Sequence, residues 1–215
     1  LILLSILFFV FPLVITPLTT DPYTLPKQIV LGGVSLVLLL FWGVRMISDG
    51  AVRLRRTPFD IALLAIILIG LLSAIFSGNR FDALIAYTPF LISIIAYFLV
   101  VNFVKSGQAL FFLATSLVVG ACLTSLLSIL SFFKVYILPF AFTKAQTFSP
   151  LGSLLDQGLY LLLVIPIAAY LAWPLTKKLG SIFEDTTGDD ILSNFDEETM
   201  RALGFLVATV LIFIG

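Results

Sequence analysis

The chain has 215 residues, of which 60% are hydrophobic and 11% are charged, and its 12 basic residues balance its 12 acidic residues. The core of one soluble domain of this length could not bury so much apolar surface, so lipid is the expected solvent for most of the chain. The balanced charge argues against a nucleic-acid-binding protein, because such proteins carry an excess of basic residues. The sequence has no histidine, so it lacks the usual neutral-pH acid–base group and the commonest transition-metal ligand.

Polar loops divide the chain into about seven apolar segments. The segments are long and apolar on all sides, which predicts helices rather than strands. As a helix, the second segment would cover about 28 Å, which matches the hydrocarbon core of a bilayer. We therefore predict an all-α integral membrane protein, a polytopic bundle of transmembrane helices, with segments at 1–16, 29–47, 61–77, 83–104, 109–133, 158–175 and from about 202 onward.

Both ends of the chain lie inside apolar segments, and the first residue, Leu1, is not a methionine. These features predict that residues 1–215 are the N-terminal part of one larger polytopic membrane domain, truncated at both ends. A cleavable signal peptide is the alternative interpretation of the first segment. It is disfavoured because no basic region precedes this segment and no small-residue cleavage site follows it.

The loops between the segments differ in their content of lysine and arginine. The even-numbered loops hold eight of these residues, including the cluster of Arg53, Arg55 and Arg56, and the odd-numbered loops hold four. Basic loops stay in the cytoplasm, so the N-terminal end and the even loops are expected there and the odd loops outside. For a bacterial protein, this orientation implies multi-pass insertion in the inner (cytoplasmic) membrane.

One loop is longer and more acidic than the others. Residues 176–201 carry seven aspartate and glutamate residues. The stretch 185–190 superficially suggests a calcium loop, but it lacks the alternating acidic spacing and the closing glutamate of an EF-hand. We predict an acidic cytoplasmic loop with a short surface helix at 190–201.

The spans themselves offer little chemistry. The single cysteine, Cys122, lies in an apolar run and is interpreted as a small buried hydrophobe. No ionisable residue falls in the middle of a span, which argues against a proton-coupled transporter, because such proteins need polar groups there. Asn102, near the end of the fourth segment, is expected to bond a neighbouring helix. Functional groups are therefore expected in the odd-numbered loops.

The odd-numbered loops and the spans beside them carry short phrases that resemble one family of bacterial membrane proteins. These phrases are Leu25-Pro26-Lys27 after the first span, the serine-bearing turn at 72–80, and the F-x-P-type phrase at 148–150, which precedes an apolar helix with an inner proline. Together with the hydropathy pattern over residues 1–175, they resemble the O-antigen ligase and O-antigen polymerase family.

This resemblance implies a GT-C-like helical fold and a metal-independent glycosyltransferase that needs no cofactor. Such an enzyme transfers an oligosaccharide from undecaprenyl diphosphate to a lipid or glycan acceptor at the external face; membrane lipids are its other partners, and nucleic acid is not one. An external arginine or lysine would neutralise the diphosphate as it leaves. The family's catalytic histidine and arginine would lie beyond Gly215, so the catalytic residues are unknown in this chain.

Four residues are candidates for binding the diphosphate, and each has a structural alternative. Arg80 could anchor the chain among lipid head groups, and Lys27 could only snorkel from the end of its span. Lys144 stands where family members often carry an arginine and an N-P-N phrase, so it would act as a point charge rather than a bidentate clamp. Asp156 could simply cap the sixth helix.

Two other classes of function stay open. A transporter or flippase of a lipid-linked glycan predicts a repeat of this topology and polar groups in the middle of the membrane. A non-catalytic membrane scaffold predicts neither these features nor an external catalytic loop. The phrases that resemble the ligase and polymerase family favour the glycosyltransferase.

Overall fold

The computed structural model describes residues 1–50, 54–184, 204, 207, 208, 210 and 211, and within 174–184 it describes the backbone alone. All regular structure in these residues is helical, and no strand occurs among them. The elements in chain order are α1 (Ile2–Val10), η1 (Phe11–Leu13), α2 (Thr24–Asp49), α3 (Asp60–Ile75), α4 (Arg80–Phe103), α5 (Gly107–Phe132), η2 (Ala141–Thr143) and α6 (Leu154–Glu184).

Four of the described helices are long and apolar enough to cross a bilayer. They are α2, α4, α5 and the part of α6 from Leu154 to Trp173. The helices α1, with the 3-10 turn that follows it, and α3 are apolar but shorter. The prediction of an all-helical chain with several candidate membrane spans is confirmed in this general form, and the predicted seventh segment lies mostly outside the described residues.

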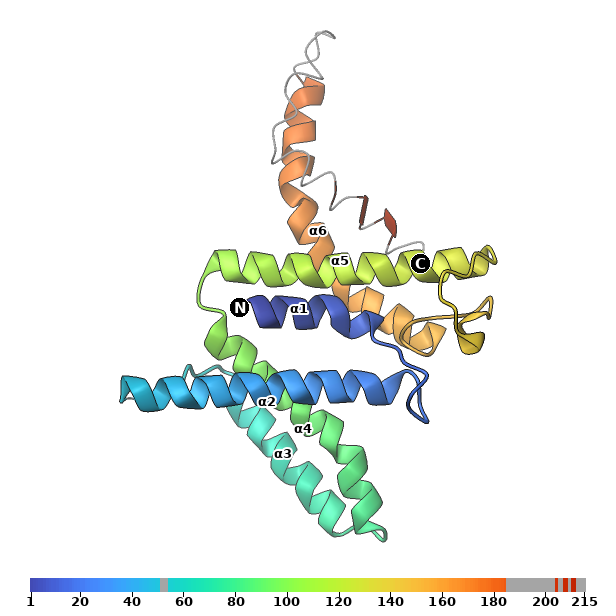
Figure 1. The fold of residues 1–215 in the computed structure, drawn as a ribbon. Coiled ribbons are helices and arrows are strands. Elements are labelled where there is room, and N and C mark those ends of the chain that lie inside the picture. The colour runs from blue at the N-terminus through green and yellow to red at the C-terminus, as the bar shows by residue number, and fades with distance from the viewer. Residues whose placement is uncertain (51–53, 185–203, 205–206, 209, 212–215) are drawn as a thin grey trace.

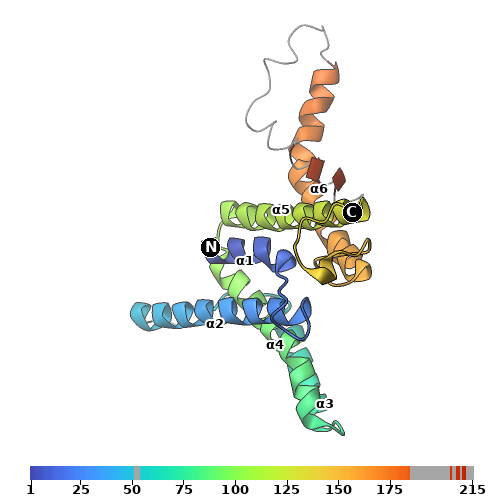
Figure 2. The same ribbon diagram turned by 45° about the vertical axis from the view of Figure 1, so that its right-hand side comes forward.

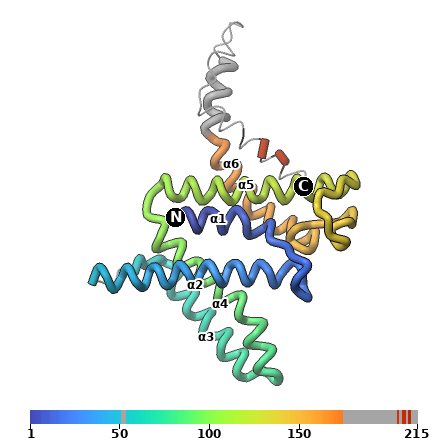
Figure 3. Tube along the Cα trace, in the orientation of Figure 1, coloured from blue at the N-terminus to red at the C-terminus, as the bar shows by residue number. Residues whose placement is uncertain are grey.

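The helices form a layer with a hairpin attached at an angle. α1 lies between α2 and α5, and α3 and α4 form a hairpin that leaves this layer beside α2 (Figures 1 and 3). α6 starts beside the end of α5 and then passes across it (Figure 2). The main packing contacts join α1 to α5, α3 to α4, α2 to α4 and α5 to α6.

Side chains just before the helices decide where the helices begin. The Asp21 carboxylate accepts hydrogen bonds from the backbone N–H groups of Tyr23 and Thr24, at 2.9 and 3.1 Å, at the start of α2. The hydroxyls of Ser106 and Ser153 accept hydrogen bonds from the first turns of α5 and α6. These bonds satisfy N–H groups that a helix leaves without partners at its N-terminus.

The boundaries of three helices differ clearly from the predicted ones. The segment predicted at 1–16 is shorter, since α1 ends at Val10 and the 3-10 turn after it ends at Leu13. α2 begins at Thr24 and α6 at Leu154, each about one turn earlier than predicted. Hydrogen bonds from side chains before each helix stabilise a first turn that contains polar residues, and hydropathy alone does not assign such a turn to the helix. α6 also continues to Glu184, so the first part of the predicted acidic loop at 176–201 is helical. The rest of that loop, with its predicted surface helix, lies outside the described residues.

Among the described side chains, two hydrophobic clusters form the core. The α5–α6 cluster consists of buried side chains of these two helices: Val118, Ala121, Leu161, Val164, Ala168 and Leu171. The α1–α2–α4–α5 cluster joins one buried leucine from each of four helices: Leu4, Leu38, Leu99 and Leu113. Many large apolar side chains on the other faces are exposed, as surfaces in contact with lipid require.

α1 approaches α5 closely at one glycine. A Cβ atom on Gly120 would lie 2.8 Å from the Phe9 carbonyl oxygen and 3.3 Å from Pro12 Cγ. Small residues allow the backbones of membrane helices to come this near, and the contact then gains dispersion energy along both helices. Gly120 therefore sets the distance between α1 and α5.

Asn102 links α4 to the segment before α3. Its side chain is buried, its Oδ1 accepts a hydrogen bond from the Arg55 N–H at 3.0 Å, and its Nδ2 donates to the Phe98 carbonyl at 2.8 Å. The partner across the contact is thus the backbone of the α2–α3 connection and not the neighbouring helix that the sequence suggested.

Replacing Asn102 with leucine should lower the free energy of unfolding by about 1–2 kcal/mol, because the Arg55 N–H would lose its acceptor. Chemical unfolding in detergent micelles measures this change. Gln108→Leu, at an exposed amide near the start of α5, serves as the control. Equal stability of the two variants would show that this bond contributes nothing.

Candidate functional site

The ends of four helices meet on one side of the molecule. The end of α1 and the start of α2 are joined by residues 14–23, here called the α1–α2 connection. They lie on the same side as the end of α5 and the start of α6, which are joined by residues 133–153, the α5–α6 connection (Figure 1). Both connections belong to the odd-numbered loops, in which the sequence predicts the functional groups.

Lys27 is a buried cation at this end. It lies in the first turn of α2 and is only 7% exposed. Its Nζ donates hydrogen bonds to the Tyr23 carbonyl at 3.0 Å and to the Pro150 carbonyl, 123 residues away in the chain, at 2.7 Å. Among the described residues, no carboxylate forms an ion pair with it. Backbone carbonyls therefore supply the hydrogen bonds that a buried charge requires.

Two further contacts join the same two connections. Gly152 has a φ of +101°, and a Cβ atom there would lie 3.1 Å from Tyr23 Cβ, so glycine suits both the backbone angle and the space. The Tyr23 ring meets the Phe142 ring edge-on, with ring centroids 5.8 Å apart. We call Tyr23, Lys27, Phe142, Pro150 and Gly152 the clasp.

Asp21 adds a negative charge close to the clasp. Hydrogen bonds from the Tyr23 N–H and from Thr24 hold the pKa of the Asp21 carboxyl below its ordinary value. Asp21 is therefore ionised at neutral pH, and its charge favours the nearby ammonium of Lys27. Because the pKa of Asp21 is lower in the folded state, the ionised carboxylate stabilises the fold at pH values above the ordinary pKa of a carboxyl. This stabilisation is lost as the pH falls through the folded-state pKa of Asp21.

Residues 149–153 form a turn. The Gly152 N–H donates to the Ser149 carbonyl at 3.0 Å, and Ser149 Oγ accepts from the Leu151 N–H at 3.1 Å. Phe148 and Ser149 are buried, with 4% and 2% of their surfaces exposed. The turn is thus an ordered part of the α5–α6 connection, and it presents the Pro150 carbonyl to Lys27.

A buried polar group that the sequence did not predict lies between α5 and α6. Gln157 is 1% exposed, and its Oε1 accepts a hydrogen bond from Ser128 Oγ at 2.7 Å. Its Nε2 and Ser125 Oγ have no hydrogen-bond partner among the described residues. The signal in the sequence is the recurrence of Ser125, Ser128 and Ser131 at every third position, which places them on one face of α5.

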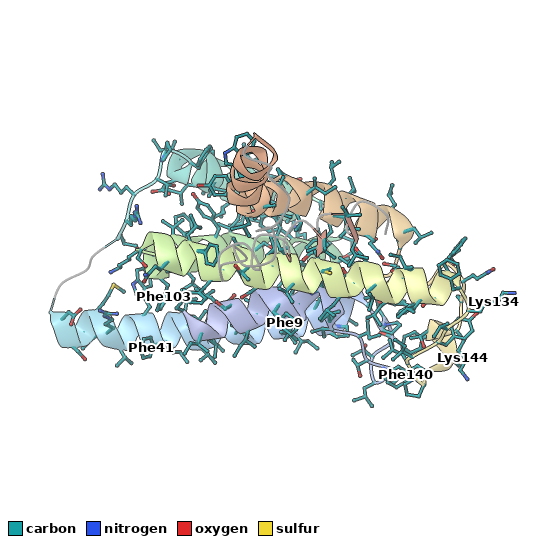
Figure 4. The ribbon with its side chains drawn as sticks, turned by 90° about the horizontal axis from the view of Figure 1, so that it is seen from above. Phe9, Phe41, Phe103, Lys134, Phe140 and Lys144 are labelled. Carbon is teal, nitrogen blue, oxygen red and sulfur yellow. The ribbon has the colours of Figure 1, made fainter. Side chains whose placement is uncertain are left out.

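The structure brings three of the four predicted site residues to this end. Lys27 belongs to the clasp, Lys144 is exposed in the α5–α6 connection, and Asp156 is exposed in the first turn of α6. Figure 4 shows Lys144 and Lys134, which is also exposed, at the edge of the molecule. Arg80 begins α4 at the α3–α4 turn, and this turn lies apart from the α5–α6 connection in two views (Figures 1 and 2).

The structural alternatives for Lys27 and Asp156 are both wrong. Lys27 does not snorkel, because its ammonium group points to backbone carbonyls and is buried. Asp156 does not cap α6, because the hydroxyl of Ser153 does so, and Asp156 makes no hydrogen bond or ion pair with the described residues. Contact of these side chains with a diphosphate stays a prediction.

This end of the molecule offers positive charge and hydrogen-bond donors. Exposed lysines on an ordered connection, next to the ends of apolar helices, can bind phosphate groups. Within the described residues, no group of three or more histidine, cysteine, aspartate and glutamate side chains is placed to hold a metal ion.

Comparison with known proteins does not assign a function, so a function has to be argued from the chemistry of this site. No protein-family model matches the chain, and no curated protein or solved structure is significantly similar to it.

Proposed function

We propose that this chain is part of a membrane glycosyltransferase of the O-antigen ligase and polymerase type. It transfers an oligosaccharide from undecaprenyl diphosphate to a lipid or glycan acceptor at the external face of a bacterial inner membrane. In this proposal the chain is the N-terminal part of a GT-C-like bundle of about seven spans, and the odd-numbered loops face outside. The observation that carries the proposal is the α5–α6 connection, which the clasp holds on α2 while Lys134 and Lys144 stay exposed.

The chemistry of the transfer explains why cations are needed at this place. The acceptor hydroxyl forms a new bond to the sugar as the bond from the sugar to the diphosphate breaks, and negative charge develops on the departing diphosphate. Ammonium groups that already lie beside the departing phosphate oxygen stabilise this negative charge, because they need not rearrange during the reaction. The base that takes the proton of the acceptor belongs to the part of the enzyme that the resemblance assigns beyond Gly215.

Replacing Lys144 with glutamine should reduce glycan transfer by the full-length protein about tenfold, because one charge-assisted contact to the diphosphate is lost. Arg80→Gln should also reduce transfer, because in this proposal the α3–α4 turn lies on the same external face as the donor. Glycan transfer is measured in cells that lack their own copy of the gene and carry each variant. Lys105→Gln, an exposed lysine at the opposite ends of α4 and α5, is the matched control and should transfer normally.

Two results would overturn the proposal. One is normal transfer by both Lys144→Gln and Arg80→Gln. The other is movement of a lipid-linked glycan across the bilayer of reconstituted vesicles without transfer to any acceptor, which would identify a transporter instead.

A further inference from the structure

A cavity of about 420 Å³ lies among α1, α2, α4, α5 and α6. Each of these helices contributes to its lining: Leu7, Leu31, Val100, Leu117 and Tyr160, in helix order. The volume falls in the range of sites for small molecules, which is about 300–1,000 Å³. The cavity is only partly enclosed, so it can be entered from its surroundings.

The walls of the cavity suit hydrocarbon. None of the described residues that line it is charged, and most are aliphatic or aromatic. Two of the lining hydroxyls are bonded within the protein, since Ser93 donates to the Pro89 carbonyl at 2.8 Å and the Tyr97 hydroxyl lies 3.0 Å from Thr57 Oγ1. A third, on Ser35, is buried without a partner among the described residues. A molecule inside the cavity would therefore meet apolar atoms and no charge.

The cavity lies between the two hydrophobic clusters of the core. Leu4, Leu38 and Leu99 of the α1–α2–α4–α5 cluster line it, and so do Leu117 and Tyr160, which pack against the α5–α6 cluster. An empty apolar cavity forfeits the dispersion contacts of its walls, and the loss grows with its volume. Apolar atoms inside the cavity would restore contacts to both clusters.

The depth of the cavity indicates which apolar atoms are available. Leu31, Ser35 and Leu38 lie on one face in the middle of α2, a candidate membrane span. At this depth, the surroundings of a spanning helix are lipid hydrocarbon chains and not water.

We infer that one acyl chain of a membrane phospholipid occupies this cavity, with its head group outside at the membrane surface. The uncharged walls exclude a head group, and the partial enclosure admits a flexible chain from the bilayer. This lipid is a bound structural component that joins the two clusters. The inference stands apart from glycan transfer, because it requires neither the donor nor the acceptor of that reaction.

The test counts the phospholipids that stay bound to the purified full-length protein. The protein is reconstituted in nanodiscs of phosphatidylglycerol and phosphatidylethanolamine, returned to detergent, washed and analysed by native mass spectrometry. Wild-type protein should retain one phospholipid per chain. Ala96→Leu, which fills the cavity from α4, should reduce the retained fraction about tenfold. Ala65→Leu, the same change on an exposed position of α3, should retain as much as wild type.

A second measurement needs no variant and decides the question if Ala96→Leu does not fold. Phosphatidylglycerol with a diazirine in the middle of one acyl chain should label Leu7 and Leu38, which line the cavity and are only 4% and 6% exposed. The inference is overturned if neither residue is labelled. Equal retention by Ala96→Leu and Ala65→Leu, or recovery of a polyisoprenoid lipid in place of the phospholipid, would also overturn it.

Discussion

Replacing Lys27 with methionine should release the α5–α6 connection from α2 and lower the free energy of unfolding by about 2 kcal/mol. Methionine keeps the unbranched apolar stem but donates no hydrogen bond, so the buried Pro150 carbonyl loses the partner that now lies at 2.7 Å. Part of this loss is offset because methionine carries no charge, whereas burying the Lys27 ammonium costs desolvation free energy in the wild-type protein. Thermal and chemical unfolding in one detergent measure the net effect.

Proteolysis separates this local release from a general loss of stability. Cleavage within residues 133–153 should become roughly tenfold faster in Lys27→Met, because cleavage follows the population of the opened connection. Lys105→Met, at an exposed lysine on the opposite side, should leave both cleavage and stability unchanged. If Lys27→Met keeps the connection protected and yet abolishes glycan transfer, Lys27 contacts the diphosphate and the clasp role is wrong.

Replacing Gly120 with alanine should lower the free energy of unfolding by about 1–3 kcal/mol, because the new methyl group cannot fit without moving a backbone. Its nearest neighbour would be the Phe9 carbonyl oxygen at 2.8 Å, which is part of α1 and cannot turn away as a flexible side chain would. α1 would have to shift away from α5, and the contact between these two is the most extensive among the helices that the structure describes.

Gly43→Ala is the matched control for this substitution. Gly43 lies within α2, and a Cβ atom there would meet nothing within 4 Å. Alanine favours a helix over glycine by about 1 kcal/mol, so Gly43→Ala should leave the midpoint of thermal unfolding unchanged or raise it. The two variants should therefore change stability in opposite directions. A rise for both would mean that α1 adapts to the methyl group at no cost.

Together, Lys27→Met and Gly120→Ala test how α1 and α2 are held on the rest of the protein. Gly120 sets the distance of α1 from α5, and Lys27 ties α2 to the connection between α5 and α6. The cavity lies among these same helices, so its shape depends on both contacts. A bound acyl chain would add a third link between the same elements.

Much of the helical pattern could be predicted from the sequence, because it depends on local hydropathy and on nearby capping residues. The segments predicted at 83–104 and 109–133 correspond closely to α4 and α5, since Asn79 and Ser106 mark where these apolar runs begin. The start of α2 differs from the predicted one because Thr24, Pro26 and Lys27 interrupt the apolar run there. Hydrogen bonds from the Tyr23 and Thr24 N–H groups to the Asp21 carboxylate, and not hydropathy, mark this start.

The candidate site divides in the same way. The sequence by itself determined that the chain is a set of apolar helices and that the odd-numbered loops hold few basic residues, namely Lys27, Arg80, Lys134 and Lys144. Only the tertiary structure decided that Lys27 is buried against Pro150, that Gln157 meets Ser128, and that a cavity separates two clusters of the core. The physical reason is distance along the chain. Hydropathy and caps act between residues a few positions apart, whereas burial of a charge depends on a carbonyl 123 residues away.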